Sequence, residues 1–142
     1  MVRNMGLFRG KRTDTEEWVV GYYVRLYDHK KNVSHRIYTG HAETDCGMYF
    51  PDWFEVDPGT LGGCAGIQDK NGNPIFDGDV LGQGATRGVV EYDPEKAAYV
   101  YRWRMWGNHA DPRFKTCKLS DYGFLRNLEI IGNIHDSPDV MG

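Results

Sequence analysis

The sequence has few cysteines and no long hydrophobic run, and both absences narrow the classes of protein it can be. The three cysteines among 142 residues are Cys46, Cys64 and Cys117, and no two of them form a C-x-x-C pair. Such an odd, widely spaced set favours free thiols in a reducing compartment over a disulfide framework. The apolar runs fall far short of the ~20 residues needed to span a bilayer, and residues 1–12 lack the apolar core of a signal peptide. We therefore expect a cytoplasmic protein without a membrane partner.

An excess of charge of one sign is also missing. The chain carries 17 basic and 20 acidic side chains, a formal net charge of −3. This total provides no electrostatic drive toward nucleic acid, although it is compatible with a local basic patch. Because affinity for nucleic acid comes chiefly from neutralised phosphates, nucleic acid is a possible but disfavoured partner.

The signature motifs of several enzyme classes are absent from the sequence. There is no G-x-S-x-G nucleophile elbow and no glycine-rich loop ending in Gly-Lys-Ser or Gly-Lys-Thr. The five histidines do not have the i, i+4 spacing of a helical zinc pair. We therefore predict no catalytic residue, no metal site and no cofactor, and we lean against an enzyme.

Two acidic motifs have structural explanations that we favour. Asp69, Asn71 and Asn73 alternate like calcium ligands, but Pro74 and Val80 replace the Gly and Glu that such a loop requires. Asn71 and Gly72 are instead typical of a type I′ hairpin turn. Asp77 and Asp79 flank Gly78, where carboxylates cap backbone amides more often than they act as an acid/base pair or a metal site.

A zinc site assembled from distant residues is a further alternative. It would use His41, Cys46 and Cys64, with Cys117 or His109 as the fourth ligand. Nothing in the spacing of these residues brings them together, so we do not favour it.

Aromatic residues and glycine are abundant, and both point to strands and turns. Aromatics make up 13% of the chain, and glycine occurs 18 times, mostly beside Asp, Asn or Pro. Segment 48–56 contains Pro51, which predicts an edge strand or two short pieces. The glycine-rich stretch 57–66 is the best candidate for an internal seam. Alternating side chains predict the other strands at 18–27, 35–39, 88–92, 97–106 and 128–135.

Short strands at regular spacing are typical of a small barrel. We expect a mainly β fold with little helix, forming a single domain over residues 1–142. It would comprise an N-terminal hairpin region at 1–66, a small SH3-like barrel at 67–136 and a frayed tail at 137–142. The predicted core residues are Tyr22, Val24, Val90, Tyr101, Ile131 and Ile134.

Several segments, taken in order, resemble a known family. They are residues 8–12, 17–22, 56–62, 65–72, 75–81 and 130–135. The stretch from Gly66 to Gly72, followed by Ile75 to Asp79, is the most specific of them. The chain resembles the YopX family of small phage and prophage proteins. The resemblance implies a β-rich fold and residence in a bacterial cytoplasm, and it transfers no activity and no catalytic residues.

Strand 97–106 contains the candidate binding residues. Arg102 and Arg104 share a strand face with nothing acidic between them along the strand, and Trp106 is one of the aromatics near them. Small β-barrels bind single-stranded nucleic acid with such a mixture, although core packing of Tyr101 and Trp103 explains the alternation equally simply. A second basic cluster is interpreted as a solvated tail. Its members are Arg3, Arg9, Lys11 and Arg12.

Three functions are compatible with these observations. The first is a non-enzymatic binding module that contacts a protein partner or a second copy of itself. The second is a nucleic-acid-binding module that uses Arg102 and Arg104. The third is an enzyme that uses Asp77, Asp79 or a histidine.

Overall fold

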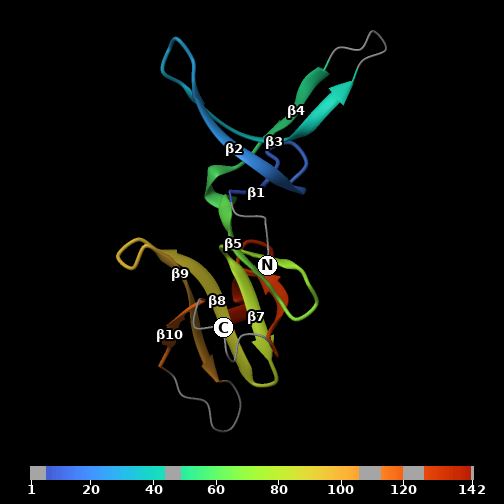
Figure 1. Cartoon of the computed structure of the whole chain (residues 1–142). Helices are drawn as coiled ribbons and strands as arrows, with labels where there is room; N and C mark the ends of the chain where they lie inside the picture. The colour runs from blue at the N-terminus through green and yellow to red at the C-terminus, as the bar shows by residue number, and fades with distance from the viewer. Residues whose placement is uncertain (1–5, 44–48, 106–112, 120–126, 142) are drawn as a thin grey trace. The chain divides into compact units, whose positions relative to one another are not determined.

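The chain is mainly β and divides into two compact units (Figure 1). The structure, a computed structural model, describes residues 6–43, 49–105, 113–119 and 127–141, with the backbone alone at 41–43, 49–51 and 140–141. The N-terminal unit is Gly6–Gly63, and the C-terminal unit begins at Cys64. This boundary lies within the glycine-rich stretch that the sequence marks as a seam. The mainly β fold is confirmed, whereas the single domain over residues 1–142 stays a prediction.

An antiparallel sheet forms the N-terminal unit. The sheet has the strand order β4-β3-β2-β1-β5-β6, in which β5 continues into the C-terminal unit and β6 belongs to that unit. The predicted β2–β3 hairpin and the predicted edge position of β4 are both confirmed. Strand β1 is new, because the sequence interpretation treated it as a tail. The elements are β1 (Phe8–Lys11), β2 (Trp18–Tyr27), β3 (Val33–Glu43), β4 (Tyr49–Glu55), the 3-10 helix η1 (Pro58–Thr60) and β5 (Gly62–Gln68).

One face of this sheet has buried apolar side chains. Ile37 on β3 is fully buried, and Val56 after β4 is buried as well. An added Cβ at Gly10 would lie 3.1 Å from Val56 Cβ, so β1 approaches this layer closely. On the same face the Tyr23 hydroxyl lies 2.7 Å from His35 Nδ1. Burial of this face fixes which side chains of β2 point inward.

The predicted phase of β2 is wrong at Tyr22, which is 66% exposed, and Val24 is only partly buried. Gly21 is the inward residue, and a Cβ there would collide with the carbonyl oxygen of Tyr38. Because successive strand residues face opposite sides, Tyr22 must point outward. The sequence pattern alone could not reveal this, since both faces of β2 contain large apolar side chains.

A second antiparallel sheet organises the C-terminal unit, in the order β10-β9-β8-β7-β11. Strand β10 is not among the strands predicted from the sequence. The elements are the rest of β5 with β6 (Pro74–Phe76), then β7 (Asp79–Gln83), β8 (Thr86–Asp93), β9 (Ala98–Met105), β10 (Lys115–Lys118), β11 (Glu129–Asn133) and the 3-10 helix η3 (Pro138–Met141). Helix η3 occupies the tail that was expected to be frayed. The described residues form no closed barrel, so the SH3-like barrel stays a prediction. None of their helices is long and apolar enough to cross a membrane.

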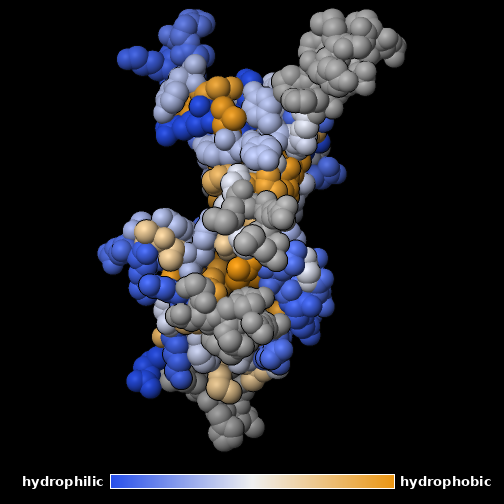
Figure 2. Space-filling view, in the orientation of Figure 1, coloured by the Kyte–Doolittle hydropathy of each residue, from blue (hydrophilic) through white to orange (hydrophobic). Residues whose placement is uncertain are grey.

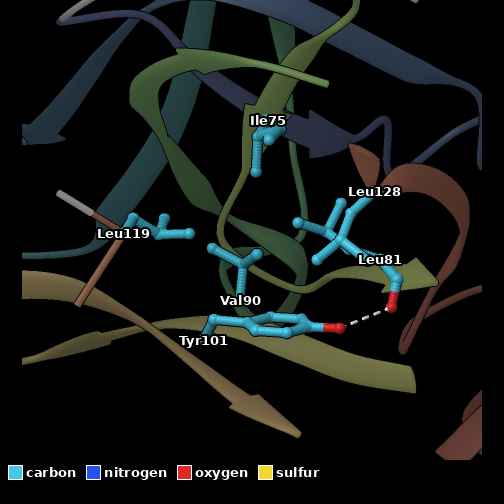
Figure 3. Packing of buried hydrophobic residues seen from close by; sticks show 6 residues of the cluster. All are labelled: Ile75, Leu81, Val90, Tyr101, Leu119 and Leu128. Carbon is cyan, nitrogen blue, oxygen red and sulfur yellow. Dashed lines mark hydrogen bonds between the residues drawn. The ribbon is translucent and has the colours of Figure 1, made fainter. Parts of the chain in front are cut away.

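The hydrophobic core of this unit gathers around Tyr101 (Figure 3). The Tyr101 hydroxyl donates a hydrogen bond of 3.0 Å to the carbonyl oxygen of Leu81. Burial raises the pKa of Tyr101 far above its ordinary value, so the neutral donor persists at all ordinary pH. Val90 and Tyr101, both predicted core residues, are fully buried. The cluster comprises Ile75, Leu81, Val90, Tyr101, Leu119 and Leu128.

Two predicted core residues near the C-terminus are wrong. Ile131 is 41% exposed and Ile134 is 37% exposed. The pairing of β11 with β7 shifts between Ile130 and Gly132, which marks a β-bulge that contains Ile131. A bulge adds one residue to a strand and redirects its side chains, so a strict two-residue alternation misassigns this segment.

The loop between β5 and β6 is held by Asp69. Asp69 Oδ1 accepts hydrogen bonds from the backbone N–H groups of Asn71 and Asn73, and Oδ2 accepts one from Ile130 on β11. Burial acts to raise the pKa of Asp69, but the backbone donors outweigh it and lower that pKa below its ordinary value. The predicted turn is confirmed. The type I′ assignment is wrong, because Gly72 has a positive φ and Asn71 does not.

Candidate binding surface

The three predicted binding residues have different outcomes. Arg102 and Arg104 lie on β9, and Trp106 lies outside the described residues. Arg102 Nε lies 3.1 Å from Glu91 Oε1 on β8, so a neighbouring strand contributes a carboxylate that inspection of β9 alone could not detect. Both guanidinium groups lie over the Phe114 ring, at 4.7 Å for Arg102 and 4.9 Å for Arg104. The structure therefore brings the two arginines together around an aromatic ring.

The sequence offered Asp77 and Asp79 as an alternative acid/base pair or metal site, and the structure gives Asp79 a structural role. Asp79 is buried, and its Oδ2 accepts a hydrogen bond of 2.8 Å from the backbone N–H of Phe76. This contact holds the turn between β6 and β7, as a capping carboxylate does. Among the side chains that the structure describes, no group of three or more His, Cys, Asp or Glu residues is gathered as a metal site would require. Cys64 and Cys117 are free thiols, whereas Cys46 and His109 lie outside the described residues.

A surface that the sequence analysis did not identify lies on the N-terminal unit. Tyr22 on β2 pairs with Tyr38 on β3, and Tyr38 pairs with Trp53 on β4. Directly paired residues of antiparallel strands point to the same side of a sheet. A row of three aromatic side chains therefore crosses the sheet, on the side opposite to buried Ile37. The Tyr38 and Trp53 ring centroids are 6.4 Å apart.

Cationic side chains lie beside these rings on the same side of the sheet. Trp18 shares the outward face of β2 with Tyr22, four residues away along the strand. From β1, Arg9 and Lys11 lie over the Trp18 ring, at 4.8 Å and 5.4 Å from its centroid. From β3, Arg36 lies over the Trp53 ring at 3.8 Å.

We call this surface the aromatic face. It consists of Trp18, Tyr22, Tyr38 and Trp53 with Arg9, Lys11 and Arg36. Tyr22 and Trp53 are exposed, at 66% and 39%. Glu55 pairs with Arg36 and lies on the same face. Figure 2 shows hydrophobic side chains at the surface of this unit among hydrophilic ones.

The basic cluster near the N-terminus is not a solvated tail, at least for its described members. Arg9 and Lys11 belong to β1 and are stacked on Trp18. Arg12 makes two hydrogen bonds to Asp14, of 2.9 and 2.7 Å, and lies over the Phe54 ring. Arg3 lies outside the described residues. Alternation in the short segment 8–11 was the signal that could have revealed β1, but glycine at its third position weakened that signal.

A cavity of about 440 Å³ borders the aromatic face at Lys11. Its lining also includes Arg12, Glu16 and Asp57, so it mixes both signs of charge. Asp57 is already engaged there, because its side chain accepts a hydrogen bond from the backbone N–H of Gly59 and caps η1. These engaged side chains favour a structural role for the cavity over a catalytic one.

Comparison with known proteins identifies a family. No curated protein matches the chain. The family model described as YopX protein matches residues 7–142, which is nearly the whole chain and contains every residue of the aromatic face and of the Arg102 and Arg104 site. The chain belongs to the YopX protein family.

Proposed function

We propose that this protein is a non-enzymatic binding module whose aromatic face binds single-stranded nucleic acid. The observation that carries the proposal is the row of Tyr22, Tyr38 and Trp53 on adjacent strands, outward-facing and accompanied by cations. Proteins that bind single strands combine aromatic rings, on which bases stack, with positive charges that follow the backbone.

The spacing of the rings supports stacking of successive bases. Neighbouring strands lie about 4.8 Å apart, so rings on β2, β3 and β4 form a stepped platform across the sheet. Bases of a single strand can separate and stack on such rings, whereas bases of a duplex already stack on one another. Stacking is tolerant of sequence, because every base has a π-face. We therefore expect binding with weak sequence preference and discrimination against duplex.

The net charge of −3 does not oppose this proposal, because binding depends on the electrostatic potential near the aromatic face and not on the total charge. Arg9, Lys11 and Arg36 lie on the face together with Glu55. A guanidinium that covers a ring with its plane keeps its N–H donors at its edge, where a phosphate can accept them. The same cations can therefore contact both the rings and the nucleic-acid backbone.

Salt dependence tests the electrostatic part of the proposal. For binding of a labelled oligothymidine of about 12 nucleotides, each phosphate contact contributes about −0.7 to the slope of log affinity against log salt. Arg9→Gln with Lys11→Gln should weaken binding at about 50 mM salt and make this slope shallower by about 1.4. Fluorescence anisotropy measures both quantities.

The matched control removes two cations from the exposed hairpin turn of the same unit. Lys30→Gln with Lys31→Gln should leave the slope nearly unchanged, since neither residue belongs to the aromatic face. Absence of wild-type binding at about 50 mM salt, where phosphate contacts are strongest, would refute the proposal. An equal loss of affinity in both double variants would show that binding depends on the overall charge and not on the aromatic face.

A protein partner or a second copy of this chain is the second candidate. Its support is the edge position of β4, since an exposed edge strand can accept a strand from another chain. Light scattering coupled to size-exclusion chromatography separates the candidates. If the protein is a monomer that still binds oligonucleotide, self-association is excluded. If it is a dimer that oligonucleotide dissociates, the dimer interface and the nucleic-acid site share one surface.

Family membership supports further proposals about origin and place. We propose that the protein is encoded by a phage or prophage and acts in the cytoplasm of the bacterial host. Consecutive antiparallel pairing from β7 to β10 is compatible with the small SH3-like barrel proposed for residues 67–136. Fractionation of an induced host culture tests the location, since recovery in the membrane fraction would contradict it.

A further inference from the structure

The outward side of the β2–β3 hairpin continues past the aromatic face into a cavity. Leu26 on β2 pairs with Ser34 on β3, and Arg36 lies two residues from Ser34 along β3. Because strand residues alternate between faces, all three point to the same side as Tyr22 and Tyr38. They line a cavity of about 330 Å³, which is within the ~300–1,000 Å³ range of small-ligand sites.

Arg36 connects this cavity to the aromatic face and has hydrogen-bond donors to spare. Its Nε donates a hydrogen bond of 3.2 Å to Ser34 Oγ, and its guanidinium carbon lies 3.8 Å from the centroid of the Trp53 ring. Its terminal Nη groups donate no hydrogen bond to any residue that the structure describes, and no ion pair joins Arg36 to the neighbouring Glu55. Two contacts therefore orient this guanidinium while its terminal donors stay available.

A hydrogen-bond acceptor lines the same cavity at Asp28. Its Oδ1 accepts from the backbone N–H groups of Lys30 and Asn32, and its Oδ2 accepts from the side-chain amide of Asn32. These donors, the Asn32 backbone N–H first, lower the pKa of Asp28 below its ordinary value, so the group is a carboxylate at neutral pH. A carboxylate oxygen has two lone pairs, so Oδ2 can accept one hydrogen bond more. The cavity thus presents a fork of donors and an acceptor.

Guanine is the base whose edges match these groups. Its N7 and O6 atoms accept two hydrogen bonds from one guanidinium, which is the commonest base-specific contact of arginine. Its N1–H and N2 amino groups are donors that a carboxylate accepts. Adenine and cytosine present an amino donor on the edge that carries N7 and O6 in guanine, and thymine presents one acceptor beside a methyl group.

We propose that Arg36, oriented by Ser34 and Trp53, selects guanine in this cavity at one position of the bound strand. The guanidinium binds N7 and O6 of the base, and Asp28 accepts from its opposite edge. This inference rests on the proposed function of the aromatic face, and it adds one selective position to rings that accept any base. In a strand of thymidine alone, the Arg36 donors remain available to a phosphate, so binding does not require guanine.

The test is fluorescence anisotropy with labelled oligothymidine of about 12 nucleotides, in which guanine, adenine or cytosine replaces one central thymine. On the full wild-type chain, the guanine strand should bind at least about 5-fold more tightly than oligothymidine, and the adenine and cytosine strands within about 2-fold of it. A strand with 7-deazaguanine, which lacks the N7 acceptor, should lose most of the gain. Because this strand changes no residue, its result does not depend on the folding of a variant.

Two variants assign the preference to Arg36. Arg36→Lys keeps the positive charge and removes the donor fork, so the guanine preference should disappear while oligothymidine binds within about 3-fold of wild type. Lys11→Gln is the matched control, because Lys11 lies over Trp18 on the aromatic face and does not line this cavity. It should weaken binding of both strands by the same factor and keep the preference. Thermal unfolding checks that each variant retains its fold.

Each other outcome contradicts a specific claim. If oligothymidine binds and guanine gives no gain, the guanine site is wrong and the aromatic-face proposal stands. If the preference survives in Arg36→Lys or with 7-deazaguanine, it comes from stacking and this inference is overturned. It is also overturned if free guanosine monophosphate binds as tightly as the guanine strand, because the cavity is then a nucleotide site. If no strand binds, the proposed function itself fails and the guanine site fails with it.

Discussion

Replacing Tyr22 and Tyr38 together by alanine is expected to weaken binding of a short single-stranded oligonucleotide by at least about 30-fold. Each base stacked on an aromatic side chain contributes about 1–3 kcal/mol, as judged by alanine substitution. The two tyrosines are direct partners across β2 and β3, so one strand that crosses the sheet contacts both rings. Anisotropy with labelled oligothymidine at fixed salt measures the loss.

Matched variants separate stacking from other effects of the tyrosines. Tyr22→Phe with Tyr38→Phe keeps the rings and removes the hydroxyls, so it should bind within a few-fold of wild type. Tyr92→Ala removes a tyrosine that is 47% exposed on the C-terminal unit, outside the aromatic face, and should leave binding unchanged. Binding that survives in the double alanine variant with its fold intact would show that the rings do not hold the bases.

The Asp69→Ala substitution is expected to lower the free energy of unfolding by about 3–5 kcal/mol. The Asp69 carboxylate is 7% exposed and accepts backbone N–H groups from Asn71, Asn73 and Ile130. Removing it leaves these donors without the acceptor that joins the β5–β6 loop to β11. Urea unfolding followed by circular dichroism measures the change. Asp93→Ala, which removes a single capping bond to Glu95 in an exposed turn, should cost about 1 kcal/mol.

Acid pH should reveal the same interaction. The pKa of Asp69 is lower in the folded protein than in the unfolded chain. Its stabilising contribution is therefore complete above the unfolded pKa of about 3.9 and is lost as the pH falls through the folded pKa. An Asp69→Asn variant should lose less stability than wild type over that acid range. If the free energy of unfolding falls equally with pH in wild type and Asp69→Asn, the role assigned to the Asp69 carboxylate is contradicted.

Local sequence patterns predicted where strands occur better than which face they bury. The span of β2 was predicted to the residue, and β8, β9 and the edge position of β4 were close, because alternation, glycine turns and Pro51 are local signals. The phase of β2 depends on Gly21 and its close approach to Tyr38, which belongs to another strand. The phase of β11 depends on its bulge against β7. Neither contact has a signature in a single segment.

The candidate surfaces show the same limit. Arg102 and Arg104 lie close together in the sequence of β9. Glu91 and Arg87 join them only through the pairing of β8 with β9, and Phe114 only through a ring contact. The aromatic face was missed because its rings come from three strands, and because aromatic residues in strands are more often assigned to a core. Charge alternates with aromatics along β9, whereas the equivalent pattern in the N-terminal unit exists only across the sheet.

Photocrosslinking tests the central claim most directly. Oligonucleotide containing 5-bromodeoxyuridine in place of thymidine would be bound to the wild-type chain and irradiated, and the linked residues located by mass spectrometry. The account predicts crosslinks at Tyr22, Tyr38, Trp53 or Trp18, all on the outward side of the N-terminal sheet. Crosslinks confined to other surfaces, with the aromatic face unmodified at saturating oligonucleotide, would contradict it.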